Sequence, residues 1–447
     1  MSSWTAEQVL ALAPDPASAK AGRTLAVAGK WLLLGNTRQA LWGECKGSGA
    51  KPYQTQVELG EPAFKCSCPS RKFPCKHALG LFLLFTTQSE AFTAEEEPPA
   101  WVGEWLAKRE RSTQAKRAKA ADTANADDPE QQAQKTVAKA KRASQRQAKV
   151  TAGLAELERW LGDLIRQGLA HAQTQPVRYW DNMASRLVDA QAPGLARWIR
   201  EMSGIAASGE GWNERLLAKL GLLQLLLAAH GHLDRLPEPL QADVRTQIGW
   251  TYKAEDLPPA AWLQDDWSIL GQRGFQEDRL QVRRTWLWGR THRRQALLLE
   301  FAFQGQALDP ALVPGRQLAA SVGYLPSAYP LRAILGERHD SVGDTAVPAD
   351  GYGAITDFLT AYAEALSRQP WLENFPVTLR SLAPGWRDEQ LLLSDPQGQA
   401  LPLHPGFPNL WHLLALSGGE PCHVFGEWDG RHLWPLSVWA QGQTAYF

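Results

Sequence analysis

The spacing of apolar residues changes several times along the chain, and its first section predicts strands followed by a helix. Four short runs have strand character, at residues 24–27, 30–35, 40–45 and 53–59. In the last run alternate residues share one face, as they do in a half-buried strand. Residues 78–85 are then apolar enough for a helix that is buried on most sides. We take residues 1–92 as one folded unit.

A helical pattern occupies the middle of the chain. Six apolar residues recur at the spacing of an amphipathic helix, namely Leu154, Leu157, Leu161, Leu164, Ile165 and Leu169. Pro193 suits the first turn of another helix. Further helices are expected at residues 179–190, 216–229 and 241–250. These segments predict an all-helical domain of packed antiparallel pairs over residues 151–255.

Beyond this domain the pattern becomes mainly that of β-hairpins. Aromatic and branched residues form three pairs of runs, at 280–289 with 295–303, within 391–403 and within 423–439. One helix is expected at residues 355–366. Residues 256–447 are therefore predicted to form a β-rich α+β domain, which makes the whole chain an α+β multidomain protein.

The segment between the first two units differs in composition. Residues 107–149 contain no aromatic residue and no Leu, Ile or Met, so they cannot form a core of their own. Their seven Lys and five Arg are set against five acidic residues, which leaves a charge of +7. A break is expected at 122–129 and a solvated helix at 135–149. We assign residues 93–150 as a charged linker rich in Ala, Lys and Gln.

Length and composition exclude several classes of protein. At 447 residues the chain is too long for one hydrophobic core. Its 47 basic and 47 acidic side chains sum to zero, so nucleic-acid contacts are confined to locally basic segments. Apolar runs stay far below the roughly 18 residues of a membrane span, and five cysteines are too few for a secreted disulfide scaffold. With no signal-peptide pattern at the N-terminus, we expect a soluble, cytoplasmic protein.

The 20 Trp residues have two interpretations. Trp286 and Trp288, two apart on one predicted strand, would share a face on which nucleic-acid bases can stack. Packing in the core is the more common role of Trp, and the alternation with polar residues favours it.

One short segment concentrates residues that bind metals. Cys66 and Cys68 are separated by one residue, and Cys75 and His77 follow with the same spacing. Residues two apart in an extended strand point to the same side, and the loop between the pairs would bring them together. Three thiolates and one imidazole make a complete tetrahedral set for one Zn²⁺. Free core cysteines or a disulfide are the alternatives, and neither accounts well for four such residues within twelve positions.

A site with four protein ligands leaves no coordination position for water or substrate, so we expect a structural zinc ion. Four basic residues nearby would offset the negative charge of three thiolates around it, namely Lys65, Arg71, Lys72 and Lys76. The other two cysteines, Cys45 and Cys422, are expected to be isolated and buried thiols.

The cysteine and histidine segment resembles the SWIM-type zinc finger, whose pattern is Cys-x-Cys, a variable gap and Cys-x-His within a β-β-α unit. The resemblance covers about residues 53–85 and implies zinc ligation by Cys66, Cys68, Cys75 and His77. The wider layout is similar to bacterial SWIM-domain proteins with helical and β-rich extensions. Some of these are encoded beside MoxR-type AAA+ ATPases and von Willebrand A-domain proteins. The resemblance therefore implies a protein partner of that kind.

Catalytic motifs are missing from the sequence, which has no phosphate-binding loop, no nucleophile elbow and no zinc-protease helix. We expect a protein without enzymatic activity, and we identify no catalytic residue and no small-molecule substrate. The sequence favours a zinc-stabilised adaptor that binds other proteins. The alternative is a nucleic-acid-binding protein that contacts DNA phosphates through the SWIM unit and the basic linker.

Overall fold

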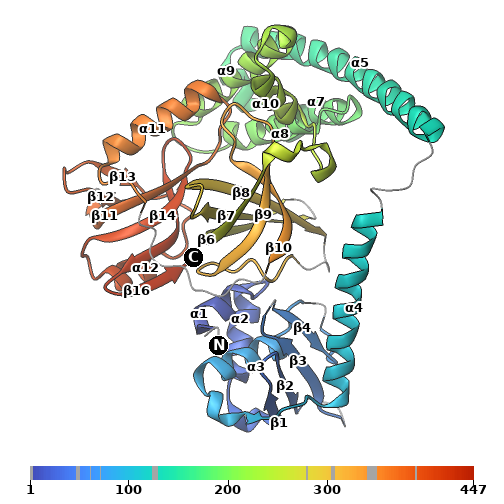
Figure 1. The fold of residues 1–447 in the computed structure, drawn as a ribbon. Helices are drawn as coiled ribbons and strands as arrows, with labels where there is room; N and C mark the ends of the chain where they lie inside the picture. Colours follow the sequence, from blue (N-terminus) through green and yellow to red (C-terminus); the bar gives the residue numbers. More distant parts are fainter. Residues whose placement is uncertain are drawn as a thin grey trace.

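The computed structural model describes residues 4–46, 51–60, 62–70, 72–122, 129–277, 280–303, 308–339, 350–387 and 390–447. These residues form helices and three sheets, so the α+β prediction is confirmed. Figure 1 shows the N-terminal unit at the bottom, a bundle of helices at the top and a β-rich part between them. The β-rich part therefore separates the two other folded parts.

The N-terminal unit is a five-stranded sheet packed against helices, with the strand order β4-β3-β2-β1-β5. Its strands are β1 (Trp31–Asn36), β2 (Ala40–Cys45), β3 (Tyr53–Glu58), β4 (Ala63–Cys66) and β5 (Thr93–Ala94). Its helices are α1 (Ala6–Ala11), α2 (Pro16–Leu25) and α3 (Lys76–Thr87). Three of the four predicted strands and the predicted apolar helix are confirmed.

The strand expected at residues 24–27 is wrong, because α2 continues to Leu25. Asp15 caps this helix, and its carboxylate accepts a hydrogen bond from the backbone N–H of Ser18 at 2.7 Å. Pro16 occupies the first turn, where its missing N–H costs nothing. These start signals outweigh the strand preference of the branched residues at the end of the helix.

Helices α2 and α3 cross at very short range, and this crossing fixes α3 on the sheet. A Cβ atom on Gly80 would lie 2.6 Å from the Cβ of Leu25, and one on Gly22 would lie 2.9 Å from the Cβ of Leu79. Only glycine lets two helix backbones approach this closely. The crossing therefore sets where the first turn of α3 lies relative to the strands.

The linker is largely helical, in α4 (Ala100–Asp122) and α5 (Pro129–Gln167). The first turn of α4 belongs to the N-terminal unit, because Val102 is buried against Trp42 of β2. Arg109 also donates to Glu58 of β3 at 2.7 Å. The helix expected at 135–149 is confirmed as part of α5, whereas residues 123–128 of the expected break lie outside the described residues.

The predicted helical domain is confirmed as a bundle around one apolar core. Its helices after α5 are α6 (Leu169–Thr174), α7 (Val177–Asp189), α8 (Pro193–Ala206), α9 (Trp212–Gly231) and α10 (Glu238–Ile248). Leu154, Leu157, Leu161 and Leu164 of α5 lie in this core, as their spacing predicts, and Leu169 packs against it. Ile165 does not, because it is 55% exposed. Of the helices that the structure describes, none is long and apolar enough to cross a membrane.

The β-rich part contains a closed barrel and a six-stranded sheet. The barrel order is β10-β8-β7-β6-β9, with β6 (Trp262–Glu277), β7 (Leu280–Gly289), β8 (Arg294–Phe303), β9 (Gln317–Tyr324) and β10 (Arg332–His339). The sheet order is β13-β12-β11-β14-β15-β16, with β11 (Phe375–Arg387), β12 (Gln390–Ser394), β13 (Ala400–Pro402), β14 (Cys422–Trp428), β15 (Leu433–Ala440) and β16 (Gln443–Tyr446). All three predicted hairpins and the helix α11 (Ile355–Arg368) are confirmed, and the sequence reasoning missed α12 (Leu410–Ser417).

Buried aromatic residues join the parts. Trp286 of the barrel and Phe425 and Trp439 of the sheet share one apolar cluster. Val313, beside the barrel, is fully buried in the core of the N-terminal unit. Trp371 enters the core of the bundle and donates its indole N–H to the carbonyl of Leu222 at 3.1 Å. The β-rich part is thus packed on both neighbours.

The core interpretation of the Trp residues holds for Trp286, which is fully buried, and Trp288 packs against the same cluster. Two other Trp side chains depart from it. Trp386 is 52% exposed and Trp411 is 72% exposed.

Asp243 on α10 links the bundle to the barrel, and its charge makes this interface depend on pH. Its carboxylate accepts hydrogen bonds from Ala328 N at 2.8 Å and from the amide of Gln369 at 3.2 Å. Burial nevertheless raises the pKa of Asp243 from 3.8 to about 6. Because the folded chain binds this proton more tightly than the unfolded chain does, its contribution to stability is complete below about pH 3.8 and is lost as the pH rises through 6.

We therefore expect Asp243→Asn to unfold at higher urea concentration than the wild type at pH 7.5, with a gain of about 2 kcal/mol. Near pH 4 the two proteins should be equally stable, because Asp243 is then protonated. Urea unfolding followed by Trp fluorescence at both pH values measures this difference. Asp234→Asn, at an exposed carboxylate, is the control. A gain of equal size at both pH values would contradict the assignment.

Candidate metal centre

The four candidate ligands come from the end of a hairpin and the start of a helix. Cys66 is the last residue of β4, where it pairs with Thr55 of β3, and Cys68 follows two residues later. Cys75 is the N-cap of α3, and His77 lies in the first turn of that helix. The β3–β4 register and the close α2–α3 crossing therefore position the two halves of the site independently.

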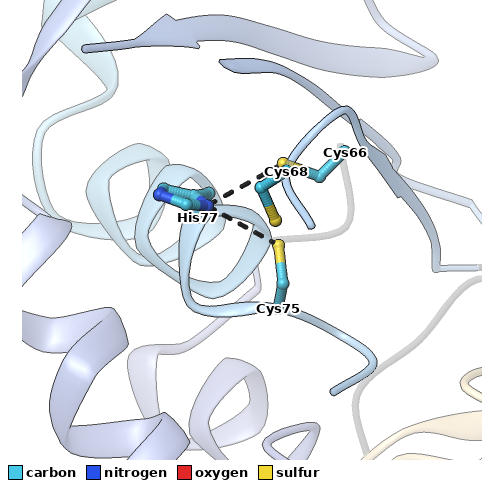
Figure 2. A group of neighbouring side chains, drawn as sticks. All are labelled: Cys66, Cys68, Cys75 and His77. Atoms are coloured by element: carbon cyan, nitrogen blue, oxygen red, sulfur yellow. Dashed lines mark hydrogen bonds between the residues drawn. The ribbon is translucent and has the colours of Figure 1, made fainter. Parts of the chain in front are cut away.

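The structure brings all four predicted ligands together. Their donor atoms lie within 4.8 Å of one another. Nδ1 of His77 is 3.9 Å from Sγ of Cys66 and 4.0 Å from Sγ of Cys75, as Figure 2 shows. With zinc bonds of about 2.3 Å to sulfur and about 2.0 Å to nitrogen, tetrahedral donors lie roughly 3.5 to 3.8 Å apart. The cluster therefore fits one zinc ion once its donor atoms move closer together by up to about 1 Å.

Burial and donor chemistry support the same fit. His77 is 6% exposed and Cys75 is 5% exposed, while Cys66 and Cys68 are half-buried. All five cysteines are free, so the disulfide alternative has no support. Three sulfur donors and one imidazole are the set that a closed structural zinc site uses.

The electrostatics of the cluster favour a thiolate. A hydrogen bond from Cys75 lowers the pKa of the Cys66 thiol to about 4, against the opposing effect of burial. The same hydrogen bond raises the pKa of Cys75, and burial raises that of Cys68. Two of the three thiols thus keep their protons until a cation compensates them, and zinc binding releases those protons.

Neighbouring residues orient the ligands. The hydroxyl of Thr55 lies 3.2 Å from Sγ of Cys66, and the ring of Tyr53 lies 5.0 Å from that of His77. Such contacts fix the ligand geometry and tune the sulfur charge. Both residues were predicted to share one face of the strand at 53–59, but the sequence did not show that this face meets the metal site.

The basic residues expected around the site are only partly free to offset its charge. Lys65, Lys72 and Lys76 are all exposed, and Lys72 forms an ion pair with Asp15 at 2.8 Å. Arg71 lies outside the described residues.

Cys45 and Cys422 lie outside the cluster and are buried, as predicted. The thiol of Cys45 is 3.6 Å from the carbonyl of Lys30, and that of Cys422 is 3.3 Å from the carbonyl of Leu382. Burial raises the pKa of both thiols. Cys422, far from the N-terminal unit in the sheet, offers a matched control for the cluster.

Bound zinc would supply a cross-link between the end of β4 and the start of α3. We expect about one zinc ion per purified chain, lost in Cys66→Ser and in His77→Ala and kept in Cys422→Ser. The zinc-free variants should also expose the N-terminal unit to proteases, because zinc-ligand bonds contribute about 10 kcal/mol or more to the folding of such small units. Elemental analysis and limited proteolysis measure both effects. A metal-free wild-type chain with a protease-resistant N-terminal unit would refute the zinc assignment.

Comparison with known families agrees with this geometry. A family model of the SWIM zinc finger matches residues 53–84, which contain all four clustered residues. A second model, of the SWIM-associated four-helix bundle domain, matches residues 145–248 in the helical bundle. No curated protein and no solved structure matches the chain. The chain therefore contains a SWIM zinc finger, whose Cys₃His cluster is compatible with one structural zinc ion, and a SWIM-associated four-helix bundle domain.

Proposed function

We propose that this zinc-binding protein is a non-enzymatic adaptor that binds another protein through its C-terminal sheet. The observation that carries the proposal is the exposed pair of Trp386, near the end of β11, and Trp411, on α12. Their ring centroids are 6.0 Å apart, so the two indoles form one surface. Trp is among the residues that most often dominate the binding energy of protein interfaces.

The large exposed fractions of Trp386 and Trp411 support binding of a partner protein at this surface. Water surrounds more than half of each indole, at 52% for Trp386 and 72% for Trp411. Most Trp side chains in this chain are instead packed into cores, and large apolar groups left exposed in a cluster commonly mark interaction sites. We call these two residues the tryptophan pair.

The metal site supports a role without catalysis. The four clustered side chains would fill all four coordination positions of a bound zinc ion, and two of these side chains are buried. No position is left at which the metal could activate water or polarise a substrate. The zinc ion then acts by holding the N-terminal unit in shape.

The resemblance to bacterial SWIM-domain proteins suggests which partners to test first. A MoxR-type AAA+ ATPase or a von Willebrand A-domain protein is our candidate partner. We propose that the complex forms in the cytoplasm, where reducing conditions keep the three thiols available for zinc.

Nucleic-acid binding is the alternative function, and one observation favours it. Lys65, Lys72 and Lys76 are exposed around the metal cluster, and α4, which begins on the same unit, leads into the segment with a charge of +7. Phosphate contacts by such residues would make binding fall steeply with salt.

For the adaptor role, we expect tagged wild-type chain to recover a stoichiometric protein partner from its own cells after nuclease treatment. The double variant Trp386→Ala with Trp411→Ala should weaken that binding about 30-fold or more, as truncation of interface Trp residues does. Leu217→Ala, at a residue on α9 that is 60% exposed, is the control and should bind normally. Quantitative mass spectrometry identifies the partner, and titration of the purified pair gives the affinities. Unchanged affinity of the double variant would refute the tryptophan pair as the binding surface.

For the alternative, labelled single-stranded and duplex DNA and RNA are titrated with the zinc-loaded chain over a salt series. If the protein is an adaptor, the double variant Lys65→Gln with Lys76→Gln should bind nucleic acid no differently from the wild type. A nucleic-acid function predicts the opposite, with the slope of log affinity against log salt reduced by about 2 in the double variant. Lys253→Gln, at an exposed lysine next to the barrel, controls for net charge.

A further inference from the structure

A pocket of about 320 Å³ lies where the helical bundle, the barrel and the start of the C-terminal sheet meet. Arg197 of α8 contributes from the bundle, Arg284 of β7 and Arg332 of β10 from the barrel, and Asn374 from the residues before β11. Ligand sites commonly form at such junctions between domains. Three guanidinium groups in one small pocket require an account of how their charges are balanced.

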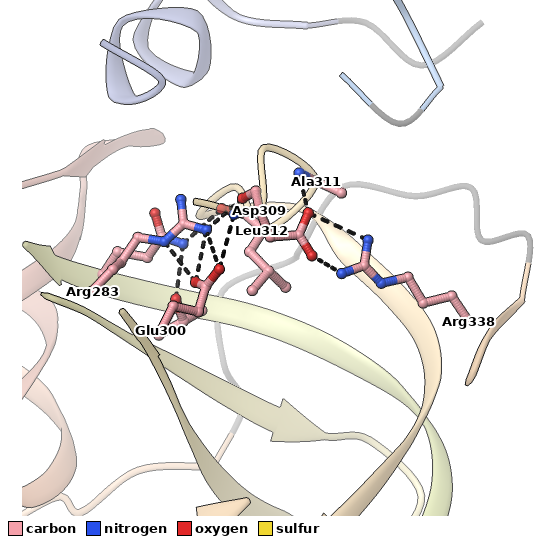
Figure 3. Close-up of polar contacts among 8 residues, drawn as sticks. Arg283, Glu300, Asp309, Ala311, Leu312 and Arg338 are labelled. Atoms are coloured by element: carbon pink, nitrogen blue, oxygen red, sulfur yellow. Dashed lines mark hydrogen bonds and ion pairs between the residues drawn. The ribbon is translucent and has the colours of Figure 1, made fainter. Parts of the chain in front are cut away.

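Two other arginines of the barrel are matched to carboxylates. Figure 3 shows Arg283 in a two-point contact with Glu300, with distances of 2.7 and 2.9 Å. Arg338 is paired in the same way with Asp309. This pairing is the normal arrangement for partly buried arginine, because an unpaired charge is costly to desolvate.

Arg332 departs from this arrangement. Within the described part of the chain it has no ion pair and no side-chain hydrogen bond. Its side chain is exposed, and the protein around the pocket lowers the pKa of its guanidinium, first by desolvation and then through the positive charges of Arg197 and Arg284. The charges that act on Arg332 are therefore those of two other arginines.

The charge of Arg284 is only partly compensated. Its Nε lies 2.9 Å from Glu427, a carboxylate that is 1% exposed, but Arg273 shares the same carboxylate at 3.4 Å. Two guanidinium groups on one carboxylate leave one positive charge in excess. Asn374, the next neighbour of Arg284, is a neutral amide.

Acidic residues of the pocket are engaged elsewhere. Glu373 is shared by Arg197 at 3.6 Å and Lys219 at 3.5 Å. Asp243 accepts hydrogen bonds from Ala328 N and Gln369, and it is not among the charges that act on Arg332. Glu277, at the end of β6, is not among the charges that act on Arg332.

The other walls of the pocket are apolar. Leu297, Leu299 and Phe301 of β8 contribute to them, together with Leu331, which directly precedes β10, and Phe275 of β6. Phe301 is 54% exposed and Phe275 is 40% exposed, so an apolar group can reach both rings from solvent. A ligand complementary to these walls has an apolar body and an anionic end.

We propose that this pocket binds an organic anion, with a carboxylate or phosphate group held by Arg332 and Arg284 and an apolar body against Leu299 and Phe301. A guanidinium fork matches the geometry of both carboxylate and phosphate. The site is separate from the zinc cluster and from the tryptophan pair, so it stands whether or not the adaptor function does.

The test uses the full-length, zinc-loaded chain and anilinonaphthalene sulfonate, a fluorescent aromatic anion, as the probe. We expect saturable binding that phenyl phosphate or decanoate displaces, and the better competitor distinguishes a phosphate from a carboxylate ligand. Arg332→Leu should weaken probe binding about tenfold or more, as loss of a charge-assisted contact does. Arg332→Lys should weaken it less, and Arg431→Leu, at an exposed arginine on the sheet, should leave it unchanged.

A second variant tests the apolar half of the site. Phe301→Ala should weaken binding of the aromatic probe but leave displacement by inorganic phosphate intact, because the anion contacts remain. Circular dichroism checks that each variant is folded. Equal probe affinity in the wild type and Arg332→Leu, or a failure of both organic anions to displace the probe from the wild type, would overturn the proposal.

Discussion

A buried carboxylate and the apolar cluster beside it join the two halves of the β-rich part, on which both other folded parts pack. Glu427 of the sheet accepts the indole N–H of Trp286 at 2.7 Å and lies 2.9 Å from Nε of Arg284, both in the barrel. At 1% exposure its charge is stable only while these partners remain. Loss of one member of such a buried pair costs about 3 to 5 kcal/mol. Because the N-terminal unit and the bundle both pack on the β-rich part, its rigidity determines where they sit relative to each other.

The zinc cluster would stabilise another part of the chain, the N-terminal unit. Its hairpin and helix are short, and the loop from Cys66 to Cys75 has little apolar surface to bury. A metal held at both ends of the loop would add ligand bonds where the apolar core of the unit does not reach. The same unit then gains further support from Val313, which the β-rich part contributes to its core. The metal orders the unit locally, and packing against the barrel fixes its position in the molecule.

The sequence predicted a structural feature correctly where a short segment determines that feature by itself. Ligand spacing at Cys66 and His77 predicted the cluster, and alternation predicted the hairpins. The pattern failed at residues 24–27, where the cap at Asp15 and the proline after it decide in favour of a helix. Closure of the barrel, the charge excess around Arg332 and the exposure of Trp411 could not be predicted, because each depends on residues far apart in the chain. Trp411 had the same local pattern as the Trp residues that are buried.

The structure also changes the interpretation of the linker, which is anchored and not a free tether. Its ends are tied down, since Arg109 pairs with Glu58 on the N-terminal unit, and Arg146 donates to the carbonyl of Gly249 at 2.9 Å and stacks over Trp250. The two helices therefore begin and end on folded parts that the β-rich part already holds in place. A flexible tether would let the zinc unit and the bundle act independently. Here the start of α4 is fixed on the N-terminal unit and α5 is fixed on the bundle, so the linker begins and ends in folded structure.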